Sequence, residues 1–220
     1  MAPVTLDTGF GLIGGYRSDP PDRPRGGLVV VHEIYGMNSH IRAVADHFAV
    51  HGYVALAPVM FDLVARDVQL GFDAESTARA RELAAAVGFE RAVCVVETAA
   101  GSLSDTVENV GVVGFSWGAT VAYLANARLG LPAVCYYGGR TVPFLDERPK
   151  APLMLHFGEH DPLTPPADIE AHREALPDAF IHLYDAGHGF NCETRADYVE
   201  AAALEARRRT VQFFTRFLQP

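Results

Sequence analysis

The sequence predicts an α/β fold in which a mostly parallel sheet is covered by helices on both faces. Short apolar runs alternate along the chain with longer stretches of helical periodicity, which is typical of parallel strands joined by helices. Several apolar runs contain almost no polar residue, as expected for strands buried on both faces. A Gly-x-Ser-x-Gly pattern at residues 114–118 lies between one such run and a helical stretch, and it marks a sharp strand-to-helix turn.

Seven runs are expected to form strands. A short one, Ile13–Tyr16, is expected to be an antiparallel edge strand near the start of the chain. The other six alternate with the helix-like runs. They are expected at Leu28–His32, Tyr53–Ala57, Val110–Phe115, Ala133–Tyr137, Leu153–Phe157 and Phe180–Tyr184.

Six helices are expected between and after these strands. Gly52 follows the first helix at a position that suits a C-cap. After the last strand there is room for one long helix and no large cap domain, so we expect an open site bordered by loops. The expected helices are Ser39–His51, Ala74–Ala86, Glu90–Leu103, Trp117–Leu129, Ala167–Leu176 and Asp197–Phe217.

Length and composition restrict the possible functions. A chain of 220 residues with 49% hydrophobic residues is expected to form one globular domain over residues 1–220. The net charge of −9, without a basic stripe, argues against nucleic-acid binding, and no long apolar segment suggests a membrane span or a signal peptide. Cys94, Cys135 and Cys192 lack metal or redox spacing, which favours free thiols in the cytoplasm and no bound metal. We expect a monomer or a small homo-oligomer.

Ser116 is the candidate nucleophile. It occupies the centre of Gly114-Phe115-Ser116-Trp117-Gly118, where glycines at both ends let the strand and the following helix pack closely. A serine hydroxyl needs a neighbouring base to act as a nucleophile. The pattern therefore predicts a catalytic serine, provided that a histidine and an acid lie nearby; an ordinary strand-helix turn is the alternative.

The base and the acid are expected on loops that follow later strands. His188 lies between two glycines just after the strand at Phe180–Tyr184 and is the expected base. Asp161, in the loop after Leu153–Phe157, is the expected acid that orients the imidazole, and Glu159 on the same turn is its rival. The backbone N–H groups of Trp117 and Ile34 are expected to form the oxyanion hole.

Several further segments make the chain resemble the dienelactone hydrolase (carboxymethylenebutenolidase) family of α/β-hydrolases. They extend from about residue 28 to the C-terminus, in the family's order. The resemblance implies hydrolysis of enol-lactones without a metal or other cofactor, with Ser116, Asp161 and His188 as the triad and Glu33 as the family's active-site glutamate. The segments are residues 32–38, Ile41-Arg42, 52–58, Tyr136-Tyr137-Gly138, 156–161 and 187–190.

The sequence departs from the family at the nucleophile, which is usually cysteine. Ser116 is either a natural serine with esterase behaviour or a replacement of a cysteine. A serine cannot be stored as an alkoxide, so Glu33 would lose the family's role in controlling thiolate formation. A structural role for Glu33, paired with an arginine near the site, is nearly as well supported as a catalytic role. A general carboxylesterase or thioesterase and a non-catalytic binding module remain alternatives.

A second departure concerns the arginines that hold the substrate carboxylate in the family. At the position expected a few residues after the histidine the chain has Cys192, with Arg195 displaced. Arg79 and Arg81 lie in the helix where another arginine is expected, and Arg81 is our choice for substrate binding. Solvated helix arginines are the alternative. Tyr35 and Trp117 are expected to line the pocket of a small-molecule ester or lactone.

Overall fold

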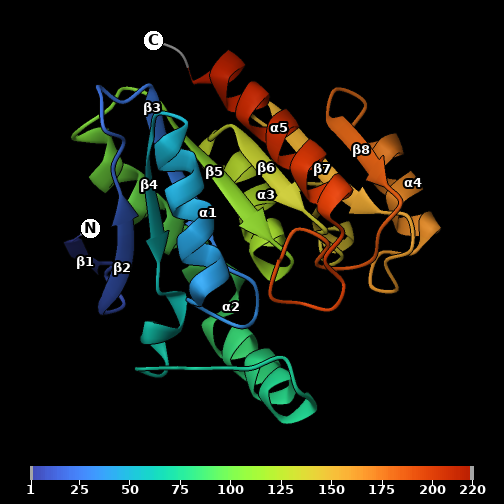
Figure 1. Ribbon diagram of the computed structural model, residues 1–220, viewed down its shortest axis with the longest axis horizontal. Coiled ribbons are helices and arrows are strands. Elements are labelled where there is room, and N and C mark those ends of the chain that lie inside the picture. Colours follow the sequence, from blue (N-terminus) through green and yellow to red (C-terminus); the bar gives the residue numbers. More distant parts are fainter. Residues whose placement is uncertain (1, 219–220) are drawn as a thin grey trace.

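The computed structural model describes residues 2–218, which form one eight-stranded sheet with helices on both faces (Figure 1). The strands lie in the order β1-β2-β4-β3-β5-β6-β7-β8. Their bounds are Ala2–Asp7 (β1), Leu12–Ser18 (β2), Gly26–Val31 (β3), Tyr53–Pro58 (β4), Val110–Phe115 (β5), Ala133–Tyr136 (β6), Leu153–Gly158 (β7) and Phe180–Tyr184 (β8).

The sheet is parallel from β4 to β8 and antiparallel only where β1 and β2 join it. The central strand β5 pairs with β3 on one side and β6 on the other, and all six of its residues are buried. Burial on both faces explains why this strand has no alternation of polar and apolar residues. The loops that follow β3, β5, β6, β7 and β8 leave the sheet at the carboxyl ends of the strands. Parallel α/β sheets form their ligand sites at this end.

The expectation of an edge strand at Ile13–Tyr16 was wrong in one respect. The strand there, β2, is antiparallel as predicted, but it is not at the edge, because β1 pairs with it from Leu12 to Arg17. In β1, the partly buried Val4 and the buried Leu6 alternate with Thr5 and Asp7 in the manner of a half-buried strand. So short an alternation at the chain end was not recognised as a strand.

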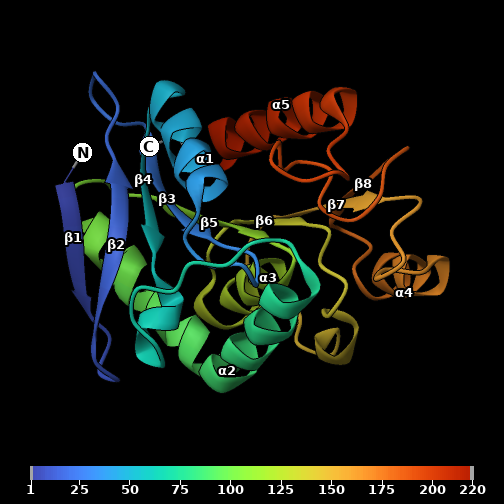
Figure 2. The ribbon, with the colours of Figure 1, turned by 60° about the horizontal axis from the view of Figure 1, so that its bottom comes forward.

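Helices cover both faces of the sheet, as Figure 2 shows. The first face is covered by α1 (Ser39–Val50) and α5 (Glu200–Phe217), and the second by α2 (Ala74–Ser104), α3 (Trp117–Leu129) and α4 (Pro166–Ala175). Each face has its own apolar core, with Phe48 and Phe214 in one and Trp117 and Leu155 in the other. Short 3₁₀ turns lie at Met60–Leu63 and Val142–Phe144.

The two helices expected at Ala74–Ala86 and Glu90–Leu103 run on from each other as α2, with a break at Gly88. Gly88 has φ of 72° and ψ of 160°, a conformation that glycine adopts without strain. The break changes the direction of the chain, and the first half of α2 extends past the end of the sheet where the loops gather (Figure 1).

Two observations limit what else the described part of the chain contains. No segment of residues 2–218 forms a large cap over the loops at this edge of the sheet. None of the helices in the same range is long and apolar enough to cross a membrane.

Candidate active site

Ser116 lies at the turn between β5 and α3, with φ of 53° and ψ of −112°. This is a left-handed backbone conformation that a side-chain-bearing residue adopts only when its surroundings enforce it. The two glycines of the motif show what enforces it. A Cβ atom on Gly114 would lie 1.9 Å from the carbonyl oxygen of Gly118, and one on Gly118 would lie 2.5 Å from that of His32. The close packing expected from the motif is therefore confirmed.

Ser116, His188 and Asp161 form one hydrogen-bonded chain, although they come from three separate loops. The Ser116 hydroxyl lies 2.8 Å from Nε2 of His188, and Nδ1 of His188 lies 2.8 Å from Oδ2 of Asp161. His188 is 8% exposed and Asp161 is 4% exposed, so water only weakly screens the contact between the two groups. With the Nδ1 proton directed at the carboxylate, Nε2 is an acceptor for the serine proton.

Asp161, rather than its rival Glu159, lies against the histidine. Its carboxylate accepts hydrogen bonds from the Leu163 backbone N–H at 2.8 Å and the Thr164 hydroxyl at 3.2 Å, which fix its orientation. Glu159 is on the same turn, but its side chain is exposed. The Asp161 and His188 loops meet at Gly158, where a Cβ atom would lie 2.3 Å from the carbonyl oxygen of Ala186.

The two expected oxyanion donors lie beside the serine. Trp117 is the first residue of α3, so its backbone N–H has no acceptor within the helix. Ile34 is in the loop after β3, and its N–H is bonded to no other residue in the described range. Ile34, Ser116 and Trp117 line the same cavity. Both amides are therefore available to a ligand placed over the serine.

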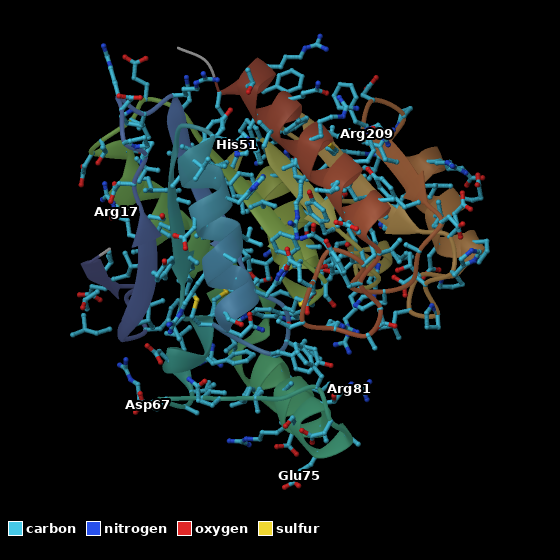
Figure 3. All side chains as sticks on the ribbon, viewed as in Figure 1. Arg17, His51, Asp67, Glu75, Arg81 and Arg209 are labelled. Atoms are coloured by element: carbon cyan, nitrogen blue, oxygen red, sulfur yellow. The ribbon has the colours of Figure 1, made fainter. Side chains whose placement is uncertain are left out.

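The cavity at Ser116 has a volume of about 380 Å³. Tyr35 and Trp117, which were expected to line the pocket, are in its lining, and so is Arg81, which was chosen as a substrate-binding residue. Figure 3 labels Arg81 on α2, near the end of the sheet where the loops gather. Sequence reasoning did not find Thr77, Leu163 or Arg140, which also contribute to the lining.

One signal could have found Arg140. It follows Gly138-Gly139 directly after β6, on the edge of the sheet where the site was already expected.

Arg195 lines the cavity even though it is displaced in sequence from the family's position. Its guanidinium lies 3.5 Å from the Glu33 carboxylate, 3.1 Å from Asp197, and over the rings of Tyr35 and Phe72 at 5.8 and 5.9 Å. Glu33 is only 2% exposed, so the ion pair is shielded from water. The pairing of Glu33 with an arginine, left open by the sequence, is present.

Two other expected positions lie outside the cavity. Cys192 is fully buried and does not contribute to the lining. Arg79 forms an ion pair with Glu82 at 2.9 Å, and both side chains are more than half exposed. Of the two helix arginines considered from the sequence, only Arg81 faces the cavity.

Tyr137 packs against the ring of His188. Its ring meets that of His188 edge to face, with centroids 5.1 Å apart. Its φ of 44° is left-handed, a strained conformation for a bulky residue. Burial and the neighbouring Glu33 carboxylate raise the pKa of Tyr137 well above its usual value, so it stays a neutral phenol. The strained residue again lies in contact with the hydrogen-bonded chain of Ser116, His188 and Asp161.

Comparison with known proteins identifies the family. The model of the dienelactone hydrolase family matches residues 13–218. The chain belongs to this family. A carboxymethylenebutenolidase from Pseudomonas putida is 29% identical to it, over 93% of this chain and 90% of that protein. A Synechocystis protein, provisionally named as a carboxymethylenebutenolidase, is also 29% identical, over 96% of this chain and 94% of its own.

The fold of a dienelactone hydrolase is present over the whole described range. A crystal structure from Klebsiella pneumoniae, of a protein provisionally assigned as a dienelactone hydrolase, matches with a TM-score of 0.89 and 24% identity, covering 98% of each chain. The predicted α/β-hydrolase fold is thereby confirmed. The chain is a hydrolase of the dienelactone hydrolase family, and this class acts on small molecules.

Proposed function

We propose that the protein hydrolyses a carboxylic ester or lactone through a Ser116–His188–Asp161 triad. The observation that supports this best is the continuous hydrogen-bonded chain from the Ser116 hydroxyl to the Asp161 carboxylate, with its serine end in the 380 Å³ cavity. A serine in a strained turn, a base at 2.8 Å and a fixed acid are the parts that acyl transfer requires.

The first half of the reaction forms an acyl-enzyme. The Ser116 oxygen attacks the carbonyl carbon while its proton passes to Nε2 of His188. The negative charge that develops on the carbonyl oxygen is held by the N–H groups of Ile34 and Trp117. The tetrahedral intermediate then collapses, the bond to the leaving oxygen breaks, and His188 returns the proton to that oxygen. In a lactone the leaving oxygen stays attached to the acyl group.

The second half releases the acid. His188 removes a proton from water, and the resulting hydroxide attacks the acyl carbon. Collapse of the second tetrahedral intermediate breaks the bond to Ser116, which regains its proton from His188. Asp161 stays ionised throughout and stabilises the imidazolium that forms twice per cycle. The carboxylate oxygens of the product come from the substrate carbonyl and from water.

An acidic group on the substrate fits one side of the cavity. Arg81 and Arg195 both line it, and a guanidinium binds a carboxylate through two parallel hydrogen bonds. The Pseudomonas putida relative is named a carboxymethylenebutenolidase, which supports a lactone with a carboxylate as the substrate of this chain. The free Cys94, Cys135 and Cys192 favour a reducing compartment such as the cytoplasm.

The direct test is hydrolysis of nitrophenyl acetate by this chain and by its Ser116→Ala and Ser116→Cys variants. We expect the unmodified chain to be active and Ser116→Ala to lose activity by about 10⁴-fold or more, because the variant lacks the hydroxyl that lies 2.8 Å from His188 Nε2. Ser116→Cys is the matched variant, since it changes one atom and keeps the turn.

The outcome separates the remaining alternatives. If the chain is as inactive as Ser116→Ala while Ser116→Cys is active, the serine replaces a functional cysteine. If all three are inactive on nitrophenyl acetate and on a carboxylate-bearing lactone, the hydrolase proposal is wrong and a binding role takes its place.

A further inference from the structure

The cavity at Ser116 is strongly positive in a protein that is negative as a whole. The chain has a net charge of −9, yet the cavity lining includes three arginines and no carboxylate. A concentration of one sign of charge in a cleft raises the local concentration of ligands of the other sign. The arginines are Arg81, Arg140 and Arg195.

Only one of these three charges is neutralised by the protein. Arg195 lies between Glu33 and Asp197, and its side chain is 14% exposed. The guanidinium groups of Arg81 and Arg140 form no ion pair or hydrogen bond with any residue in the described range. Two positive charges therefore remain available to a ligand beside the nucleophile.

The unpaired charges belong to opposite sides of Ser116. Arg81 lies one helical turn beyond Thr77, whose hydroxyl is 3.2 Å from that of Tyr35 in the loop after β3. Arg140 lies in the loop after β6. In the sheet, β3 and β6 flank β5, the strand that ends at Ser116, on its two sides. A ligand bridging the arginines would cross the position of the serine.

The backbone holds Arg140 firmly at the rim of the cavity. A Cβ atom on Gly139 would lie 2.4 Å from the carbonyl oxygen of Leu163, so the chain is pressed against the Asp161 loop just before Arg140. Just after it, Thr141 is fully buried and donates its hydroxyl hydrogen to the carbonyl oxygen of Gly138 at 3.0 Å. Arg140 is thus an exposed side chain between two anchored residues. Such an arrangement reduces the entropy lost when a ligand binds.

We infer that Arg140 forms a second anion subsite, opposite the side of Arg81 and Arg195. The substrate class is then an ester or lactone with two acidic groups, one on each side of the bond that is cleaved. This inference rests on the proposed function, because it assumes that Ser116 attacks a carbonyl between the two subsites. Each carboxylate is held by a guanidinium that has no counter-ion among residues 2–218.

The test compares four chromogenic esters that differ only in where a carboxylate is placed. Nitrophenyl butyrate has none, nitrophenyl hemiglutarate has one on the acyl side, carboxynitrophenyl butyrate has one on the leaving group, and carboxynitrophenyl hemiglutarate has both. Values of kcat/KM are divided by each ester's rate of alkaline hydrolysis. We expect each carboxylate to raise the corrected kcat/KM about tenfold, the effect of a charge-assisted hydrogen bond at a partly exposed site.

Two variants assign the subsites, and a third is the control. Arg140→Gln should lower the corrected kcat/KM about tenfold for esters with a carboxylate on one side of the cleaved bond, which removes the preference for that carboxylate. Arg81→Gln should do the same for esters with a carboxylate on the other side. Arg79→Gln removes the same charge two residues from Arg81 but outside the cavity, and it should leave both preferences intact.

The result can overturn the inference without touching the proposed function. If the esters are hydrolysed but Arg140→Gln behaves like Arg79→Gln, there is no second subsite. If Arg140→Gln weakens both preferences equally, Arg140 contributes only to the general field of the cavity, and the subsite is again excluded. If no ester is hydrolysed by the unmodified chain, it is the proposed function that fails.

Discussion

His188 and His156 are two buried histidines with similar contacts and different surroundings. Each has both ring nitrogens in hydrogen bonds, and each faces a hydroxyl group. In His188 the partners are Ser116 and Asp161. In His156 they are the Tyr184 hydroxyl at 2.8 Å and the Thr210 hydroxyl at 3.1 Å.

The surroundings decide what each imidazole can do. His156 is fully buried between the sheet and α5, and both of its ring nitrogens are bonded to hydroxyl groups rather than to a carboxylate. Burial, together with the nearby positive charge of Arg209, lowers its pKa well below the usual value, so it stays neutral. His188 is bonded to the Asp161 carboxylate through Nδ1, and it lines the cavity. A histidine-hydroxyl contact becomes a candidate for catalysis only when both are present.

The largest expected effect comes from replacing His188, compared with replacing His156. His188→Ala should lower kcat/KM for nitrophenyl acetate by roughly 10⁴- to 10⁶-fold, because Ser116 then has no proton acceptor. His156→Gln, which retains groups able to bond both hydroxyls, should stay within about tenfold of the parent per folded molecule, since His156 does not line the cavity. Steady-state kinetics corrected for the folded fraction measure both. Equal losses in the two variants would contradict the assignment of His188 as the base.

A smaller effect is expected from the acid alone. Asp161→Asn keeps the shape of the residue but offers an amide where Nδ1 of His188 needs an acceptor, so the wrong tautomer is favoured. We expect kcat to fall by roughly 10³- to 10⁴-fold. Glu159→Gln, on the same turn but exposed, is the matched control and should have little effect. A large loss in the Glu159 variant and none in the Asp161 variant would reverse the choice of acid.

The smallest expected effect is the contribution of His156 to the pH dependence of the free energy of unfolding. Its pKa in the folded state is depressed below the unfolded value of about 6.5, so at lower pH the unfolded chain binds the proton that the folded chain refuses. The free energy of unfolding should therefore fall as the pH decreases below about 6.5, by up to about 1.4 kcal/mol per pH unit from this group. Urea unfolding between pH 7 and pH 5 measures the slope.

His156→Gln should reduce that slope by the share of one histidine. His32, whose pKa burial lowers to about 4, contributes to the slope in the same direction and remains in the variant. An unchanged slope in His156→Gln would mean that the pKa of His156 is the same in the folded and unfolded states, which contradicts the expected depression.

Strong local signals made much of the fold predictable from the sequence. The strands Val110–Phe115 and Phe180–Tyr184 and the helix Trp117–Leu129 have the expected bounds. Each begins or ends at a glycine-containing turn or at an abrupt change in periodicity. β1 was missed because six residues at a chain end contain too little periodicity. The last helix begins at Glu200 rather than Asp197, a difference typical of helix ends.

The site was predictable only where short motifs follow strands. Ser116, Asp161 and His188 each lie a few residues beyond a buried strand, so the topology of a parallel sheet brings them together. The arginines were harder to place. Arg195 enters the cavity because Gly189 has no side chain. A Cβ atom on Gly189 would lie only 2.7 Å from the guanidinium carbon of Arg195. Contacts of this kind depend on how loops pack, and spacing along the chain does not reveal them.

The glycines around the nucleophile restrict how this protein can change. Adding even a methyl group at Gly114 or Gly118 would drive it into backbone atoms, which cannot move aside without displacing β5 or α3. The tip of the turn has no such restriction, since the Ser116 side chain is partly exposed at the cavity. A lineage built on this turn can exchange the side-chain oxygen at its tip for sulfur in one mutation. The frame that presents the atom is far less free to vary, so new chemistry is easier to acquire here than new architecture.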